Sequence, residues 1–284
     1  MDALDIERAD GTRWKVSLRR FVREHRFSTP DHVAHEFDIL RLAEAAGIPA
    51  PRPLLLDAKG ELFGVPALVL SYISGRPLFA SKNVGPWTDS LARALQTVHA
   101  VTPDRFDLSG LSVYLREGMQ ERIEHEWTPA QTEPLLAEIH PVLEAGLGQI
   151  DFSAPTLVHD DYWPGNTIWY RGRLAAIVDW TAAELGDPRA DVAQCRVDLT
   201  ISHGIEVADA FRRDYERLAG RPLHGLWFFD LFRGVRALSQ FELWLKGYRD
   251  LGLHVHPAEV DRRLRTFLRR ALAEQGVRDG APAP

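Results

Sequence analysis

The sequence predicts an α+β fold with a small β-rich N-terminal lobe and a larger helical C-terminal lobe. Apolar and polar residues alternate on both sides of the turn dipeptide Asp10-Gly11, which is typical of a β-hairpin. From Trp87 onward, most segments have the spacing of amphipathic helices. One β-patterned stretch, residues 157–180, interrupts these helices. Strands followed mainly by helices indicate an α+β protein.

Within the small lobe, one helix and two strands are predicted after the hairpin. Thr29 can cap a helix whose first position is Pro30. The strands predicted in this lobe are residues 4–9, 13–18, 51–56 and 67–73. Turn-forming residues beginning at Gly75 end the lobe, so we expect domains at residues 1–74 and 75–284.

The larger lobe is predicted to consist of helices around one short hairpin. The helical segments are residues 91–99, 135–147, 189–201, 207–218, 226–245 and 257–274. The hairpin is formed by residues 167–170 and 174–178, which flank a tight turn at Gly172. The aromatic residues of segment 227–248 are interpreted as helical core, with a substrate-binding wall as the alternative. Cys195 is interpreted as a buried, inert thiol.

Composition and charge exclude several classes of partner. The formal net charge is −6 and the sequence pI is near 6.0, without a lysine- or arginine-rich block, so we expect no nucleic-acid partner. The single cysteine excludes an internal disulfide and a cysteine-based zinc site. The first residues do not resemble a signal peptide, and no apolar run is long enough to span a membrane. We therefore expect a cytoplasmic protein without a membrane partner.

The most informative polar residues are Asp161, Asn166 and Asp179. An apolar strand ends at Val158, and Asp161 and Asn166 follow it in a loop. Asp179 follows the return strand of the hairpin, and because a hairpin brings its ends together, we expect the three side chains to lie close. One carboxylate can then accept a hydroxyl proton while the other carboxylate and the amide oxygen hold Mg²⁺, which suits phosphoryl transfer. The alternative is a hairpin with polar turn residues and a capping aspartate.

The order His159-x-Asp161-x-x-x-x-Asn166, followed by Ile-Val-Asp-Trp at residues 177–180, resembles a known motif pair. It is similar to that of the aminoglycoside phosphotransferase/choline kinase-like superfamily, whose members are relatives of the protein kinases. The resemblance implies a protein-kinase-like bilobal fold. The chain departs from the usual motif at Asp160, where the family has glycine.

The resemblance also implies roles for individual residues. In the larger lobe it implies a catalytic base at Asp161, bracing of the catalytic loop by His159 and Asp191, and Mg²⁺ ligands at Asn166 and Asp179. In the small lobe it implies that Arg19, which replaces the family's lysine, contacts the nucleotide phosphates and pairs with Glu36. The backbone expected to meet adenine is that of Ser71, Tyr72 and Ile73. The alternative for Arg19 and Glu36 is a surface arginine and a solvated glutamate.

One part of the family's small lobe is expected to be missing. Only three residues stand before the predicted strand that begins at Leu4, so neither the family's first strand nor its glycine-rich, phosphate-covering turn can be drawn. This absence and Arg19 leave open a catalytically impaired kinase-like nucleotide-binding or regulatory module.

The activity implied by the resemblance is Mg²⁺-dependent transfer of the γ-phosphate of ATP to a hydroxyl of a small molecule, with GTP as the alternative donor. The acceptor would be an aminoglycoside, amino-alcohol, sugar or similar compound. Residues 1–74 would bind the nucleotide, and residues 75–284 would carry catalysis and the acceptor. A protein kinase is disfavoured because the chain between Asn166 and Gly186 is too short for a long activation segment.

Residues 106–151 are strongly acidic. They contain nine acids and two arginines, a local charge of −7. A solvated helix face is one interpretation. The other is a field that favours a cationic acceptor, in which case some of these acids should line the same cleft as Asp161.

Overall fold

The computed structural model describes residues 1–7, 10–22, 29–125, 133–253 and 255–276. By their internal contacts, the residues form two compact units. Met1–Leu78 and Gly165–Ala183 make the first, and Phe79–Pro164 and Glu184–Pro284 make the second. The segment that carries Asn166 and Asp179 is therefore part of the same unit as the N-terminal strands. The functional boundary between residues 74 and 75 remains a prediction.

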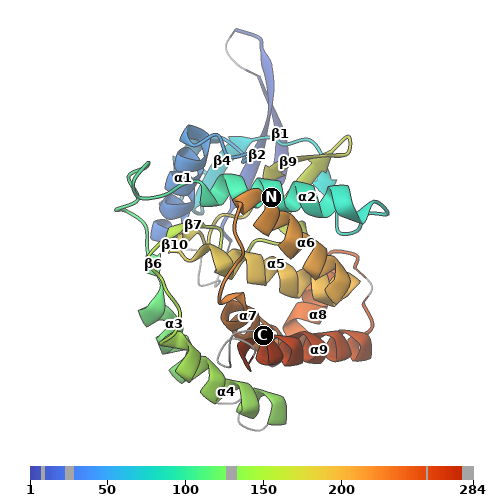
Figure 1. Ribbon diagram of the computed structural model, residues 1–284. Coiled ribbons are helices and arrows are strands. Elements are labelled where there is room, and N and C mark those ends of the chain that lie inside the picture. The colour runs from blue at the N-terminus through green and yellow to red at the C-terminus, as the bar shows by residue number, and fades with distance from the viewer. Residues whose placement is uncertain (8–9, 23–28, 126–132, 254, 277–284) are drawn as a thin grey trace. The chain divides into compact units, whose positions relative to one another are not determined.

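An antiparallel sheet of order β1-β2-β4-β3 forms the centre of the first unit. Its strands are β1 (Asp2–Glu7), β2 (Arg13–Arg20), β3 (Pro53–Asp57) and β4 (Ala67–Ser71). Alternation in β2 buries Val16 and Leu18 and turns Arg19 to the opposite face. Figure 1 shows β1 and β2 as a long two-stranded ribbon. The predicted hairpin is confirmed, although Arg8 and Ala9 of its predicted first strand lie outside the described residues.

Helix α1 (Pro30–Ala45) begins as its sequence predicts. The side chain of Thr29 accepts a hydrogen bond from the backbone N–H of His32 at 3.4 Å, and Pro30 takes the first helical position. The chain leaves the helix through Gly47, whose φ of +72° suits glycine.

A second sheet in the first unit has the order β5-β8-β9. It consists of β5 (Arg76–Pro77), β8 (Thr167–Tyr170) and β9 (Arg173–Ile177), and it confirms the predicted second hairpin. Gly75 precedes β5 with a φ of +131°, and a Cβ there would lie 2.4 Å from the carbonyl oxygen of Trp169. Only glycine allows this close approach.

The second unit is mainly helical and contains one small sheet of order β6-β10-β7. Its strands are β6 (Val113–Tyr114), β7 (Thr156–Val158) and β10 (Glu184–Gly186). Its helices are α2 (Val84–His99), α3 (Arg116–His125), α4 (Pro134–Leu147), α5 (Pro188–His203), α6 (Ile205–Ala219), α7 (Leu226–Ser239), α8 (Phe241–Asp250) and α9 (Pro257–Gly276). None of the described helices is both long enough and apolar enough to cross a membrane.

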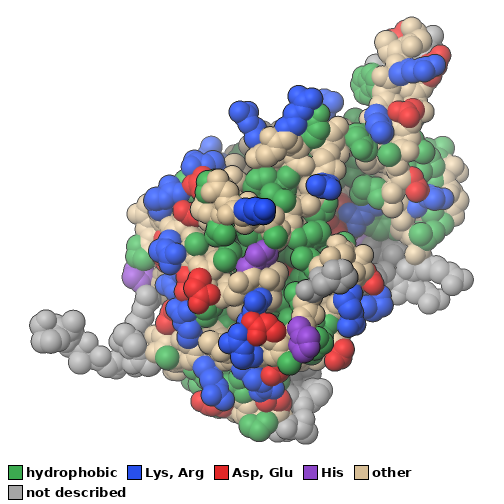
Figure 2. Space-filling model, turned by 90° about the vertical axis from the view of Figure 1, so that its right-hand side faces the viewer, with side chains coloured by type: hydrophobic (Ala, Val, Ile, Leu, Met, Phe, Trp, Pro, Cys, Tyr) green, Lys and Arg blue, Asp and Glu red, His purple; other side chains and the backbone are tan. Residues whose placement is uncertain are grey.

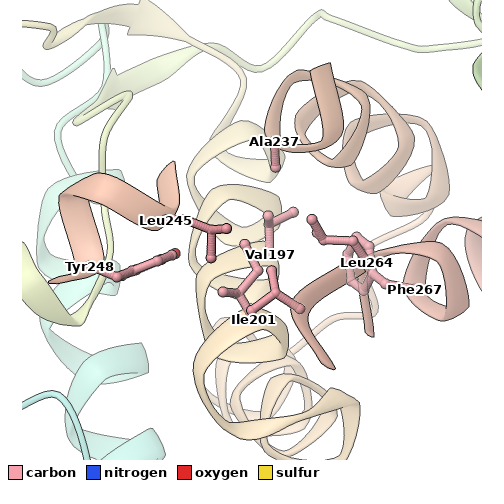
Figure 3. Packing of buried hydrophobic residues seen from close by; sticks show 8 residues of the cluster. Val197, Ile201, Ala237, Leu245, Tyr248, Leu264 and Phe267 are labelled. Atoms are coloured by element: carbon pink, nitrogen blue, oxygen red, sulfur yellow. The ribbon is translucent and has the colours of Figure 1, made fainter. Parts of the chain in front are cut away.

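The prediction of one helix over residues 226–245 is wrong, because α7 ends before Gln240 and α8 begins after it. Gln240 has φ −108° and ψ 26°, outside the α-helical range. The helical spacing of apolar residues continues across this point, so the pattern alone does not reveal the break. The break lets α8 direct Leu245 and Tyr248 toward α5 (Figure 3).

The core next to this break is formed by side chains from four helices. They are Val197 and Ile201 from α5, Ala237 from α7, Leu245 and Tyr248 from α8, and Val260, Leu264 and Phe267 from α9. All are at most 3% exposed. On the surface shown in Figure 2, basic and acidic side chains are interspersed, in keeping with the many exposed ion pairs.

Candidate active site

The loop that carries Asp161 follows β7, a strand that is buried along its whole length and paired with β10. The backbone N–H groups of His159 and Asp160 donate hydrogen bonds of 2.7 and 2.8 Å to the two carboxylate oxygens of Asp191. Asp191 lies fully buried in the first turn of α5. The predicted bracing of this loop by Asp191 is thus present as a pair of hydrogen bonds to the loop backbone.

His99, to which the sequence did not point, contacts Asp191, and Tyr215 contacts His99 in turn. The Nε2 atom of His99 lies 3.1 Å from Asp191, and the Nδ1 atom of His99 lies 2.6 Å from the hydroxyl of Tyr215. Burial raises the pKa of Asp191, but the hydrogen bond and charge of His99 and the loop N–H outweigh it, so the pKa of Asp191 is lowered. An ionised carboxylate therefore anchors the loop.

Asp160, which stands where the family has glycine, has a specific partner. Its φ of +59° lies in the left-handed region that glycine adopts most easily. Its carboxylate accepts a hydrogen bond from the guanidinium of Arg233, a residue of α7 that is 0% exposed. The only sequence signal for this pair was an arginine among the apolar residues of α7, and it was missed.

The ring of His159 is buried beside the ring of Tyr162, with centroids 6.1 Å apart. The Tyr162 hydroxyl donates to the carbonyl oxygen of Leu91 in α2 at 2.8 Å. His159 therefore contributes to the loop through its backbone N–H and its ring packing. Its role in catalysis stays a prediction.

Asp161 lines a cavity of about 250 Å³ in the second unit. Its lining residues come from the loop, from α5, α7 and α8, and from positions 240 and 251 at the ends of α8. They are Asp161, Trp163, Gln194, Asp198, Arg236, Gln240, Leu243, Trp244, Gly247, Tyr248 and Leu251. The Tyr248 ring lies 5.7 Å from that of Trp163 and 6.5 Å from that of Trp244, between centroids. Of the aromatic run predicted as core, Trp244 and Tyr248 thus also form a cavity wall.

The alternative interpretation of the acidic segment, in which some of its acids line the cleft of Asp161, has no support in this cavity, because none of the acids in segment 107–151 is among its lining residues. Among those that the structure describes, all are exposed except Glu133. Glu133 accepts a hydrogen bond from Arg265 at 2.6 Å. The acids of α3 and α4 therefore form a solvated face, and Glu126 lies outside the described residues.

Asp198 is the most deeply buried acid of the cavity. Burial raises its pKa to about 7, although hydrogen bonds from the Tyr248 hydroxyl and from Gln194 Nε2 and the charges of Arg236 and Arg233 lower it. Near neutral pH, a large share of Asp198 is protonated.

The raised pKa of Asp198 predicts a pH-dependent stability. Because its folded pKa of about 7 exceeds its ordinary value of 3.8, the folded state holds the proton more tightly. Its contribution to the free energy of unfolding is therefore complete below pH 4 and is lost as the pH rises to 7, with a slope of at most about 1.4 kcal/mol per pH unit. Asp198→Asn should flatten the pH profile measured by urea unfolding. A profile parallel to that of the wild type would contradict the assignment, and Asp38→Asn, an exposed site on α1, is the control.

In the first unit, Arg19 connects two acids. Its Nη1 donates to Glu36 Oε1 at 2.6 Å, the pairing expected from the sequence, and its Nη2 donates to Asp179 Oδ1 at 2.7 Å. Glu36 is 1% exposed, so the pair is not a solvated surface pair. Burial raises the pKa of Glu36 to about 7, with the charge of Arg19 opposing and that of Asp179 adding to the rise.

The hairpin of β8 and β9 brings Asn166 and Asp179 together within the first unit. The backbone N–H of Val178 donates to the carbonyl oxygen of Asn166 at 2.9 Å, next to Asp179. The Asp179 carboxylate also accepts from Thr181 Oγ1 at 3.0 Å. Asp161 belongs to the second unit and is linked to Asn166 by the four intervening residues of the chain.

The side-chain oxygens of Asn166 and Asp179 suit a metal ion that is bound together with nucleotide phosphates better than one coordinated by protein side chains alone. Among the residues that the structure describes, no group of three or more His, Cys, Asp or Glu side chains could hold a metal ion. Asn166 and Asp179 offer one amide and one carboxylate, and Mg²⁺ typically uses one or two carboxylates together with phosphate oxygens and water. Their assignment as ligands therefore remains consistent with Mg²⁺.

The segment expected to meet adenine starts at the end of β4. The Ser71 N–H donates to the carbonyl oxygen of Arg52 at 2.9 Å, and the Ser71 hydroxyl accepts from the Arg52 N–H at 2.8 Å. The Tyr72 ring lies under Lys15 Nζ at 4.5 Å. A role of Ser71, Tyr72 and Ile73 in binding adenine remains a prediction.

The fold is that of kinase-like phosphotransferases whose structures are solved. The sequence matches the phosphotransferase enzyme family over residues 5–227, so the chain belongs to that family.

Solved structures of the same fold include two informative neighbours. Choline kinase LicA from Streptococcus pneumoniae is 18% identical with a TM-score of 0.60, covering 95% of this chain and 90% of its own. A thermostable mutant of aminoglycoside phosphotransferase APH(4)-Ia, in a ternary complex with ADP and hygromycin B, is 18% identical with a TM-score of 0.61, covering 94% and 93%. The fold is therefore the protein-kinase-like fold that the sequence predicts.

Among curated proteins, acyl-CoA dehydrogenase family member 11 of Gallus gallus is 30% identical over 176 residues. The match covers 57% of this chain and 22% of that protein. The chain spans about a fifth to a quarter of the length of the first curated relatives that it matches.

Proposed function

We propose that this protein transfers the γ-phosphoryl group of ATP to a hydroxyl of a small molecule with the help of Mg²⁺, GTP being the alternative donor. The observation that carries the proposal is the position of Asp161. It stands on a loop whose two preceding N–H groups are fixed to the buried Asp191, and it lines a cavity large enough for a small acceptor. A rigid carboxylate beside a cavity suits a general base.

In the proposed reaction, Asp161 accepts the proton of the acceptor hydroxyl as the acceptor oxygen bonds to the γ-phosphorus. The bond between the γ-phosphorus and the β–γ bridging oxygen breaks, and ADP leaves with that oxygen. Such transfers depend on positioning and on charge stabilisation, since the protein forms no covalent bond. The two hydrogen bonds from the loop to Asp191 supply the positioning.

The first unit supplies the groups for the nucleotide in this proposal. Asn166 and Asp179 would hold Mg²⁺, which neutralises developing charge on the phosphates when bound. Arg19 already pairs with Asp179, so its guanidinium stands beside the expected phosphate site. The buried Glu36 fixes Arg19 from the other side. ADP in the hygromycin B complex of the neighbouring aminoglycoside enzyme supports an adenine nucleotide.

The experiment that tests the proposal is a phosphoryl-transfer screen. The protein is incubated with Mg²⁺ and γ-labelled ATP or GTP and with a panel of amino-alcohols, aminoglycosides, sugars and hydroxy acids. The expected result is a phosphorylated acceptor, detected by mass spectrometry, that disappears when the metal is chelated. Nucleotide binding without transfer to any acceptor would instead favour a nucleotide-binding or regulatory module.

Removing either proposed Mg²⁺ ligand should weaken use of the nucleotide. Asp179→Ala and Asn166→Ala each remove one oxygen donor, so we expect a higher KM for Mg²⁺-ATP or a lower kcat, by about tenfold or more. Asp179→Ala also removes one of the two carboxylates that Arg19 contacts, so Thr181→Ala, which removes a hydrogen bond to Asp179 but keeps its carboxylate, serves as the control. Unchanged kinetics and unchanged Mg²⁺ dependence in both variants would remove these residues from metal binding.

A further inference from the structure

Arg236 is unusual among the arginines of α5 and α7, two of the helices that line the cavity. On α5 and α7, Arg189 pairs with Asp187, Arg196 with Asp230, and Arg233 with Asp160. Arg236 is half-buried in the cavity wall, and within the described part of the chain its guanidinium forms no ion pair or hydrogen bond. A desolvated guanidinium without a partner is costly, which indicates that its partner comes from outside the chain.

The carboxyl groups around Arg236 are each engaged elsewhere. Arg233 and Arg122 add positive charge, while Asp160, Asp161 and Asp198 add negative charge. Asp160 is bound to Arg233, Asp161 is the proposed base, and Asp198 accepts hydrogen bonds from Tyr248 and Gln194. Burial, followed by the neighbouring arginines, lowers the pKa of Arg236, which is the response of a cation whose charge is not fully compensated.

The rest of the cavity is suited to an apolar body. The rings of Trp163, Trp244 and Tyr248 form one wall. At the rim, Leu243 and Leu251 are 65% and 48% exposed, so a ligand that covered them would remove apolar surface from water.

We infer that the acceptor is a hydroxy acid with an apolar body, whose carboxylate binds Arg236 while its hydroxyl lies at Asp161. This inference rests on the proposed function for the role of the hydroxyl, but not for the binding of the carboxylate. Guanidinium and carboxylate form two parallel hydrogen bonds, which would fix the acceptor in one orientation. The aromatic wall and the leucines at the rim would contact the apolar body of the acceptor between its carboxylate and its hydroxyl.

Binding and transfer are tested separately. Octanoate carries the carboxylate and an apolar chain without a hydroxyl, so its binding, measured by calorimetry, does not depend on transfer. We expect octanoate to bind the wild type, to bind Arg236→Gln about 10- to 100-fold more weakly, and to exceed octanamide in affinity by a similar factor. Arg249→Gln, an exposed site on α8, is the control and should bind octanoate like the wild type. Equal affinities of wild type and Arg236→Gln for octanoate would overturn the inference.

Transfer is then measured with hydroxyoctanoates and their amides, the hydroxyl being placed at successive carbons. The wild type should phosphorylate at least one acid with a higher kcat/KM than its amide, and Arg236→Gln should raise KM for the acid while sparing the amide. A loss of kcat with acids and amides alike would show that Arg236 serves the transferred phosphate, and would overturn the inference. Octanoate binding through Arg236 without transfer to any hydroxy compound would overturn the proposed function and the role of the hydroxyl, and would support the carboxylate site at Arg236.

Discussion

Asp161→Asn is expected to lower kcat by about 10²- to 10⁴-fold, the usual contribution of a positioned general base. Asparagine has nearly the same volume but cannot accept a proton from the acceptor hydroxyl. The backbone N–H groups of His159 and Asp160 hold the loop on Asp191, and the substitution leaves these hydrogen bonds in place, so the fold should survive. The measurement is steady-state transfer to the acceptor found in the screen, with the free energy of unfolding measured by urea titration.

Two comparisons make the result for Asp161→Asn interpretable. Asp38→Asn makes the same chemical change at an exposed position of α1 and should leave kcat unchanged. In Asp161→Asn, the affinity for Mg²⁺-ATP should also stay close to that of the wild type. A kcat within a factor of two of the wild type would exclude Asp161 as the base.

Arg233→Met is expected to lower the free energy of unfolding by about 3–5 kcal/mol, since it leaves the buried carboxylate of Asp160 without its cation. Arg233 is 0% exposed and Asp160 is 7% exposed, so water cannot replace the lost partner. Methionine keeps much of the apolar length of the side chain. Chemical unfolding of the wild type and the variant measures the loss.

The second half of this test is the double variant Asp160→Gly/Arg233→Met. It removes both charges, and glycine suits the φ of +59° at position 160, so most of the lost stability should return. Asp160→Gly alone should be destabilised because Arg233 is then left without its carboxylate. If the two single effects simply add in the double variant, the ion pair does not couple these residues.

Local signals in the sequence predicted the local structure well. The dipeptide Asp10-Gly11 marks the first hairpin, and Thr29 marks the start of α1. Both features depend on residues within a few positions of one another, so they are present in the sequence itself. The pairing of Arg19 with Glu36 was also expected, because a strand and the following helix have a recurrent arrangement in the family that the motifs resemble.

Features that depend on distant parts of the chain could not be predicted in the same way. Arg233 meets Asp160 across 73 positions, and His99 meets Asp191 across 92. No local pattern links such residues, and the sequence does not distinguish a buried arginine of a helix from an exposed one. The cavity beside Asp161 could not be predicted either, because the residues that α8 contributes to its lining are placed by the break between α7 and α8 at Gln240.

The cavity is lined by the buried Tyr248 on one side and by the exposed Leu243 and Leu251 at its rim, and this difference has a consequence for how the protein can evolve. Tyr248 is 3% exposed and belongs both to the cavity and to the core of α5, α7, α8 and α9, so changing it alters folding and recognition together. Leu243 and Leu251 are exposed at the rim, where substitutions typically change stability by less than about 0.5 kcal/mol. New acceptor preferences can therefore arise by mutational drift at the rim, without first requiring a stabilising change elsewhere in the chain.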